Sequence, residues 1–437
     1  MTAYAGNSPE DKKLQVHITV MQYTKFRESR MININEIKLS QFQMIRVPTR
    51  NERWMILTTL AGLLLLNSEM SIASVECSPY SADIPRTDTI QLAPINISAG
   101  VDMPNGTVIY RGAWFGGRPG YQITCTNDTA TDSFDYTFNL GIYTAPLPLS
   151  GWRSSPFYGR IYETGIPGIG VAISDYSAGV TESLPYANGG VRTLSMKGNN
   201  KVSQTIPNSR RFFNLIKIGP INPGSYTLSA ANLPTAKIYY DNAPGRTPVN
   251  GFPIISNIMQ FQGVLNVSAQ TCTTPDVNVP MGTYDADTEL SGIGSATPWI
   301  KVNLALQNCP TFYGYYNNAN TVMMFDYSKG GASNIPASTS NTITARFTPN
   351  TTIINNATGI MGVDPSASPA ASGVGIQLGW GDGAPAPIDF NVPQKQTLPK
   401  DGTKNINVPL YARYIQTEKK VTPGQANGKV TFTINYN

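Results

Sequence analysis

The stretch VTPGQANGKVTFTINYN, residues 421–437, decides the fold. Apolar side chains recur there at every second position, at Val430, Phe432, Ile434 and Tyr436, with polar residues between them. This period of two indicates a strand with one buried face. Pro-Gly and Asn-Gly pairs at 423–424 and 427–428 predict turns before it. An unpaired edge beside an apolar face is costly, so we expect a neighbour from elsewhere to cover this strand.

The same residues resemble the C-terminus of chaperone–usher fimbrial subunits of Gram-negative bacteria. Members of that family end in an alternating apolar strand with a penultimate aromatic residue, here Tyr436, and have a glycine fourteenth from the end, here Gly424. The preceding LYARYIQTEKK, residues 410–420, also matches the pattern. In that family an immunoglobulin-like fold lacks its final strand. A periplasmic chaperone lends a strand first, and the N-terminal extension of the next subunit then replaces it.

The resemblance therefore implies an incomplete pilin domain with a groove for a chaperone or donor strand. The residues lining that groove would be Val430, Phe432, Ile434 and Tyr436. Outside this stretch the composition favours an all-β protein, because only 14% of the 437 residues are charged, while glycine (39) and proline (33) are abundant. Such a composition is typical of many short strands joined by tight turns.

The N-terminal residues predict export. Residues 54–66 are an apolar run of 13, too short to span a bilayer comfortably, with arginines before it and a small-x-small site at 71–73. Residues 54–73 therefore indicate a signal peptide cleaved near Ala73, and residues 1–53 a leader of doubtful status. Removing residues 1–73, with nine basic and six acidic side chains, lowers the net charge from +5 to +2, so the charge gives no indication of nucleic-acid binding.

Four cysteines remain after this cleavage, and an even number in an exported chain favours disulfides. Three pairings are possible. We predict the local one, with one bridge in each half: Cys77–Cys125 and Cys272–Cys309. Zinc is disfavoured because the cysteines are not closely spaced and the only histidine, His17, lies in the leader. No metal or cofactor is predicted.

The strand pattern divides the mature chain into two parts. Short apolar segments between Gly and Pro clusters predict a β-sandwich over residues 74–245, the receptor-binding domain. The Pro-, Gly- and Asn-rich residues 246–257 predict a linker. Residues 258–437 resemble a fimbrial pilin domain, with VPMG at 279–282 and LQNCP at 306–310 as further matches.

The spacing between the predicted cleavage site and the first cysteine is decisive. Cys77 follows Ala73 by four residues, so a donor strand of ~10 residues does not fit between the cleavage site and this cysteine. We therefore expect a subunit that receives a donor strand and has none to give. In the family it resembles, such a two-domain subunit is a tip adhesin. A structural or adaptor subunit without its own receptor is the alternative.

The segment CTNDTATDSFDY, residues 125–136, is similar to mannose-binding fimbrial tip adhesins, which have Cys-x-Asn-Asp followed by an Asp-Tyr pair. The resemblance implies that Asn127, Asp128 and Asp135 bind sugar hydroxyls, with Tyr136 or Trp152 stacking on the sugar face. YETGIPGIGV, residues 162–171, looks more like type 3 fimbrial adhesins, which bind matrix proteins. A plain turn after a strand also explains Asn127 and Asp128.

Enzymatic chemistry is not expected. Without a histidine in the mature chain there is no base for a nucleophilic triad. Paired carboxylates of a secreted hydrolase remain an alternative. The prediction is thus a non-enzymatic adhesin, exported through the periplasm of a Gram-negative bacterium to the tip of an extracellular fimbrium. Its expected partners are a periplasmic chaperone, an outer-membrane usher, the adjacent fimbrial subunit, and a host glycan or matrix protein.

Overall fold

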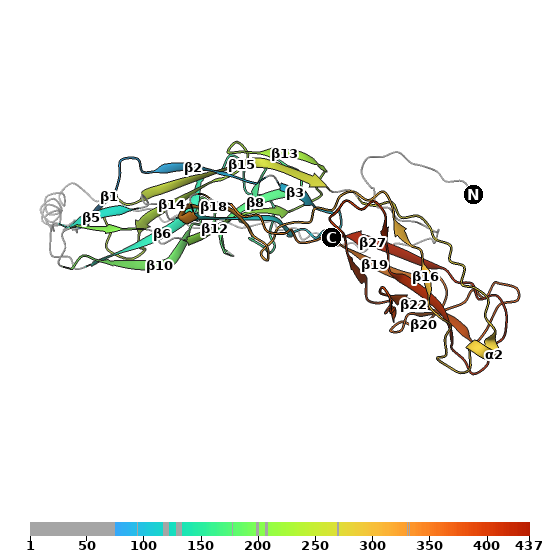
Figure 1. Ribbon diagram of the computed structural model, residues 1–437. Coiled ribbons are helices and arrows are strands. Elements are labelled where there is room, and N and C mark those ends of the chain that lie inside the picture. Colours follow the sequence, from blue (N-terminus) through green and yellow to red (C-terminus); the bar gives the residue numbers. More distant parts are fainter. Residues whose placement is uncertain are drawn as a thin grey trace, which may run out of the picture. The chain divides into compact units, whose positions relative to one another are not determined.

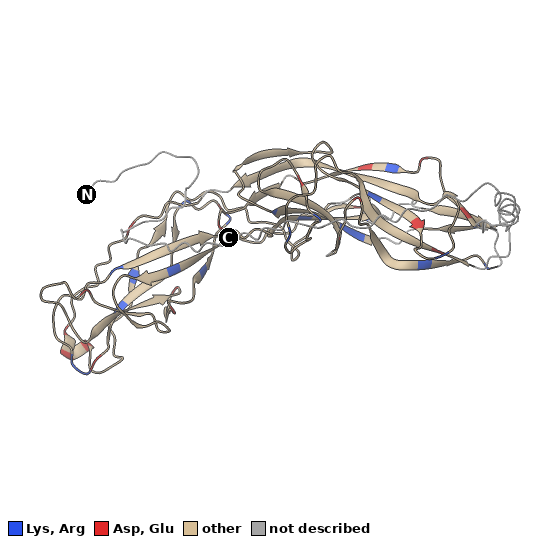
Figure 2. Cartoon of the chain, turned by 180° about the vertical axis from the view of Figure 1, so that it is seen from behind, with Lys and Arg blue, Asp and Glu red and all other residues tan. Residues whose placement is uncertain are grey.

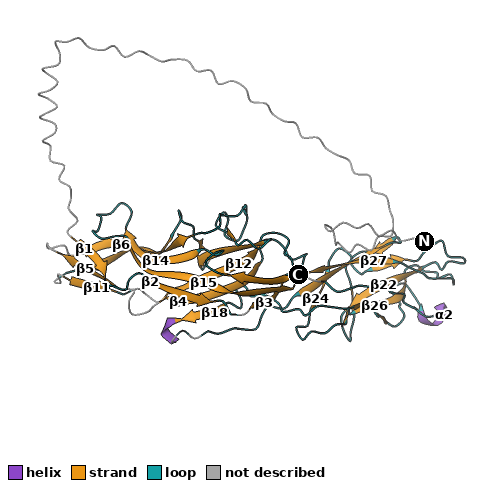
Figure 3. Cartoon of the chain, turned by 90° about the horizontal axis from the view of Figure 1, so that it is seen from above, coloured by secondary structure: helices purple, strands orange, loops and turns teal. Residues whose placement is uncertain are grey.

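The computed structural model describes residues 75–437 apart from 94, 117–121, 128–132, 177, 198–200, 206–208, 269–270, 330 and 332. All described residues belong to one compact unit. They are nearly all strands and loops (Figure 3), with helix limited to the short pieces α2 (Ala286–Glu289) and η1 (Tyr327–Lys329). None of these helices could cross a membrane. The leader and signal-peptide predictions lie outside the described residues.

The first sandwich is built from two large sheets, both mixed but mostly antiparallel, and one small antiparallel sheet (Figure 1). One sheet has the order β10 (Tyr186–Ser195), β6 (Ser133–Thr144), β14 (Thr235–Asn242), β15 (Ile254–Ser268) and β13 (Gly224–Leu228), with β2 (Arg86–Gln91) and β3 (Ile95–Ser98) parallel to β15. The other has the order β18 (Val322–Asp326), β4 (Val108–Gly116), β12 (Ser209–Lys217), β8 (Ile169–Asp175) and β7 (Tyr162–Glu163), with β9 (Ala178–Gly179) on β8. The small sheet contains β1 (Val75–Pro79), β5 (Ile123–Asn127) and β11 (Lys201–Gln204).

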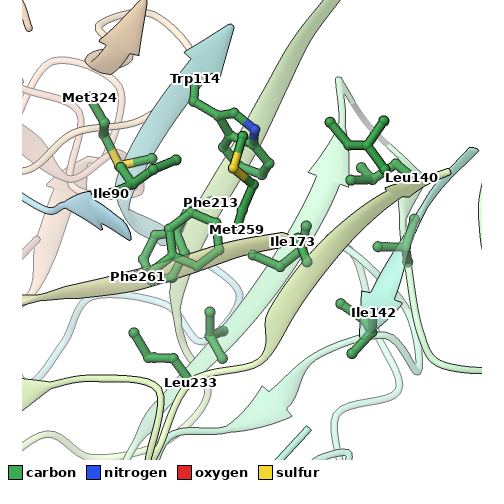
Figure 4. Close-up of a cluster of buried hydrophobic side chains, with 14 of the residues drawn as sticks. Ile90, Trp114, Leu140, Ile142, Ile173, Phe213, Leu233, Met259, Phe261 and Met324 are labelled. Carbon is green, nitrogen blue, oxygen red and sulfur yellow. The ribbon is translucent and has the colours of Figure 1, made fainter. Parts of the chain in front are cut away.

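The core of this sandwich lies between its two large sheets. Figure 4 shows side chains from many strands meeting there, including Trp114 of β4, Phe213 of β12 and Phe261 of β15. The Trp114 and Phe261 rings meet edge to face with centroids 5.2 Å apart. Met324 of β18 joins the same cluster. A strand from far along the chain therefore completes the core of the first sandwich.

The second sandwich has its own core of buried side chains. Its largest sheet has the order β16 (Ile300–Val302), β26 (Leu410–Gln416), β22 (Val374–Trp380), β21 (Ile360–Gly362) and β20 (Ile353–Asn355), with β23 (Ala386–Pro387) on β22. A second sheet has the order β24 (Gln394–Thr397), β19 (Thr342–Pro349) and β27 (Val430–Tyr436). The pair β17 (Ala305–Leu306) and β25 (Ile406–Asn407) completes it.

Both predicted disulfides are present. Cys77–Cys125 links β1 to β5 at directly opposed positions, and Cys272–Cys309 lies in the core of the second sandwich. The all-β prediction is confirmed as well.

The predicted domain limits differ from the structure in two places. Residues 254–257, assigned to the linker, begin β15, which pairs with β14 and β2 inside the first sandwich. Within the predicted pilin domain, 258–268 continue β15, and β18 pairs in parallel with β4. The physical reason is packing: Ile254 and Met259 of β15 and Val322 of β18 are buried in the first core. Local Pro and Gly content could not reveal such long-range pairing.

Candidate functional site

The edge of β27 is the first candidate site. The strand pairs with β19 on one side, from Ile343 opposite Tyr436 to Pro349 opposite Val430. On its other side no strand pairs with it within the described part of the chain. An open edge of this kind can accept an extended segment of another polypeptide.

Register determines which backbone groups face that edge. Asn437 and Thr342 exchange two hydrogen bonds of 2.8 and 2.9 Å, and the carbonyl of Lys429 accepts from the Asn350 amide. Bonding alternates along an antiparallel pair, so the odd-numbered residues face β19. The amides and carbonyls of Val430, Phe432, Ile434 and Tyr436 therefore point to the open side.

The side chains of the same four residues rest on the core of the second sandwich. Val430, Phe432 and Ile434 are only half buried, whereas Tyr436 is 6% exposed and stacks on Phe312 with ring centroids 6.2 Å apart. Burial raises the pKa of the Tyr436 hydroxyl. Three neighbouring apolar side chains are thus left partly uncovered beside unpaired backbone groups, and an added strand would cover both.

Asp135 lies at the second candidate site, a cavity of about 420 Å³ in the first sandwich. The residues lining it are Val75, Ser133, Phe134, Asp135, Arg246, Thr247, Pro248 and Val249. Asp135 accepts a hydrogen bond of 2.6 Å from the hydroxyl of Thr193 and forms an ion pair with Nε of Arg246 at 3.4 Å. A carboxylate and a guanidinium side by side can accept from and donate to neighbouring hydroxyls. We call this the Asp135 cavity.

Asn127 lies next to the Asp135 cavity. It ends β5 directly opposite Val75, one of the lining residues, and it is half buried. The Cys77–Cys125 bridge crosses the same two strands two positions away and fixes their backbone. Asp128 lies outside the described residues. The structure therefore brings Asn127 and Asp135 to one region of the sandwich.

Tyr136 is not available for stacking on a ligand, so its predicted role is wrong. It is 4% exposed, and its ring lies in the core between Phe134 and Tyr240, with centroids 6.0 and 5.8 Å away. This burial raises the pKa of its hydroxyl. The reason is the strand period: neighbouring residues on β6 face opposite sides, so an outward Asp135 requires an inward Tyr136.

Trp152 is not part of the Asp135 cavity either. Between Asp135 and the end of β6 at Thr144 the chain advances by roughly 30 Å at the usual strand rise. Trp152 lies beyond that end, where it packs against the small cluster containing Ile216 and donates from its indole nitrogen to the Pro156 carbonyl at 3.1 Å. We assign it to local packing.

Two residues that bind the Asp135 carboxylate were not anticipated. Arg246 is the first residue of the predicted linker and ends a Pro-Gly-Arg turn, which its amide closes on the Ala243 carbonyl. Thr193 lies on β10 opposite Asp135. A basic residue in an otherwise uncharged turn was the available signal for Arg246, but nothing local could pair it with Asp135.

Outside the Asp135 cavity, the charged side chains of the described residues are spread over both sandwiches (Figure 2). Figure 2 shows Lys, Arg, Asp and Glu scattered over mostly uncharged strands. Asp285 caps the single turn of α2 by accepting a hydrogen bond from the Asp287 amide at 3.0 Å. In the described ranges no three of the metal-ligating side chains His, Cys, Asp and Glu gather.

Known proteins similar to this chain are fimbrial. Residues 259–437 match the family model described as fimbrial protein. A fimbria adhesin protein of Klebsiella pneumoniae is 23% identical over 385 residues, covering 87% of this chain and 99% of that relative. These matches show a fimbrial protein domain over residues 259–437 and a similarity to a fimbria adhesin along most of the chain.

Two of the solved structures that match are adhesins. The CupB6 tip adhesin of Pseudomonas aeruginosa aligns with a TM-score of 0.30 and 12% identity, covering 83% of this chain and 94% of that one. The receptor-binding domain of the adhesin MrkD1P of Klebsiella pneumoniae aligns with a TM-score of 0.26 and 20% identity, covering 46% of this chain and 98% of that one.

Proposed function

We propose that this fimbrial adhesin-like protein works at the tip of a fimbrium, where it is joined to the shaft by strand addition at β27 and binds a host-surface ligand through its first sandwich. The open edge of β27 carries the proposal. It combines unpaired backbone groups with half-buried apolar side chains at alternate positions. An incoming strand would satisfy the backbone groups and cover the side chains together.

Export and assembly follow from this edge. An uncovered apolar edge promotes aggregation, so a periplasmic chaperone would lend a strand before assembly. At an outer-membrane usher the adjacent fimbrial subunit would then replace it. The chain would be held on the extracellular fimbrium, with the first sandwich free to meet a host surface.

The ligand of the first sandwich is a host glycan or a matrix protein. The Asp135 cavity supports this proposal because Asp135, Arg246 and the nearby Asn127 offer a carboxylate, a guanidinium and an amide. Those groups hydrogen-bond to sugar hydroxyls and to exposed peptide groups alike. The disulfide beside them limits backbone motion, which lowers the ordering cost of binding.

One observation favours the alternative of a structural or adaptor subunit without a receptor. Arg246 and Thr193 already satisfy the Asp135 carboxylate in the absence of ligand. In that case the ion pair of Asp135 and Arg246 would serve only to hold the turn at 243–246 against β6.

Binding of the full chain to arrays of glycans and matrix proteins tests the receptor role. Asp135→Asn should weaken binding roughly 10- to 150-fold, because a charge-assisted hydrogen bond is lost. The matched control is Asp83→Asn, which removes another carboxylate with an arginine partner, Arg86, away from the cavity. Equal binding by both variants would reject the Asp135 cavity, and no binding to any array by the unchanged chain would favour the adaptor alternative.

A further inference from the structure

One end of the open edge of β27 is already occupied by the first sandwich. The Tyr436 amide, which points to the open side, donates to Oδ2 of Asp102 at 3.0 Å. Gly100 lies against the Tyr436 carbonyl so closely that a Cβ on Gly100 would come within 2.3 Å of that oxygen. Residues 100–102 therefore cover the amide and the carbonyl at which a further pair of strand hydrogen bonds would form.

These residues form a turn that the core holds in place. The Met103 amide closes it on the Gly100 carbonyl at 3.1 Å, and the Ala99 amide before it donates to Ser268 of β15. The buried Asn341 side chain donates to the carbonyls of Ser98 and Asn437, at 2.9 and 3.2 Å. The turn and the end of β27 are thus fixed to one buried amide, so the turn cannot move aside without breaking these bonds.

The remaining open edge has a definite length. Val430, Phe432 and Ile434 keep outward backbone groups, and the same three residues have half-buried side chains. Tyr436 differs in both respects, because its side chain is buried and its amide is bonded. The backbone hydrogen bonding and the side-chain burial therefore both place the end of the acceptor surface between Ile434 and Tyr436.

We propose that the turn at residues 100–102 is a stop that sets the register of the incoming strand. The partner is an extended segment of another fimbrial subunit with apolar residues at alternate positions, which pairs with residues 430–434 and ends before Tyr436. A longer paired segment would have to displace the Asp102 carboxylate and pass Gly100. This inference rests on the proposed strand addition at β27 and adds the feature that limits the length of the added strand.

Hydrogen exchange of the full chain, measured residue by residue, tests the stop without any partner. In the unchanged chain the Tyr436 amide should exchange at least tenfold more slowly than the amides of Phe432 and Ile434. In Asp102→Ala this protection should be lost, while Val101→Ala should keep it. Val101 is 56% exposed in the same turn and is the matched control. Equal protection of Tyr436 in both variants would overturn the stop.

Synthetic peptides test the register. The probes are blocked Thr-Val-Thr-Val-Thr and the same sequence lengthened by one Val-Thr pair. Both should protect residues 430–434 with similar affinity in the unchanged chain, and in Asp102→Ala the longer peptide should gain roughly fivefold. If residues 430–434 are protected but the longer peptide gains the same affinity in the unchanged chain, the stop is rejected and strand addition stands. No protection of 430–434 by either peptide would reject strand addition, and with it the stop.

Discussion

Replacing Met324 with alanine should destabilise the first sandwich, although this residue lies within the segment that matches the fimbrial family. Met324 belongs to β18, which pairs in parallel with the edge of β4. Its side chain is 4% exposed and lies directly on Gly112, where a Cβ would come within 2.3 Å of the Met324 sulfur. The truncation should therefore leave a cavity against β4.

The expected cost follows from core truncations in general. Replacing a buried methionine with alanine lowers the free energy of unfolding by about 2–5 kcal/mol. Even the lower limit corresponds to roughly 30-fold faster exchange of amides that open only by unfolding of the sandwich. Ile335→Ala is the matched control, because Ile335 lies in the same excursion of the chain but is 50% exposed. That variant should change stability by less than about 0.5 kcal/mol.

Hydrogen exchange by mass spectrometry on peptides from β4 and β12 gives the required readout, since it reports each sandwich separately. Met324→Ala should accelerate exchange in both strands, with a smaller effect on β22 and β26 of the second sandwich. Unchanged exchange in β4 and β12, with faster exchange confined to β22 and β26, would refute the assignment of β18 to the first core.

Three further changes should act on stability, each measured by thermal or urea unfolding. Replacing both cysteines of either bridge with serine should lower the free energy of unfolding by about 4 kcal/mol, because the bridges close loops of 48 and 37 residues in the unfolded chain. An unchanged free energy of unfolding would contradict this. Gly424→Ala should cost about 1–3 kcal/mol, because its Cβ would lie 2.5 Å from the Ala370 backbone; Gly292→Ala, with open space around it, is the control. Trp152→Ala should lower stability and leave ligand binding intact, whereas lost binding at unchanged stability would restore its predicted role.

The sequence predicted the elements whose evidence is local. β27 was predicted because its apolar residues alternate without interruption, and the disulfides because each joins cysteines within one part of the chain. The glycine fourteenth from the end was noted only as a family feature. The structure supplies its cause, the close approach of Gly424 to the backbone of Ala370.

Elements that depend on distant partners were missed. β18 has five residues between polar loops, and its partner β4 lies more than 200 positions earlier in the chain. The same holds at the Asp135 cavity, where Arg246 reaches Asp135 only because the folded chain brings the turn at 243–246 to β6. Strand period alone could have excluded Tyr136 from the site, because a ligand-binding Asp135 must face outward and its neighbour on the strand then faces inward.

Thermal unfolding of the full chain, with and without the N-terminal extension peptide of an adjacent fimbrial subunit, tests the central claim most directly. If the second sandwich is completed by an added strand at β27, its melting temperature should rise with peptide concentration, with a stabilisation of about 2.7 kcal/mol at 100 times the dissociation constant. A soluble monomer whose melting temperature does not respond to the peptide at any concentration would contradict the account.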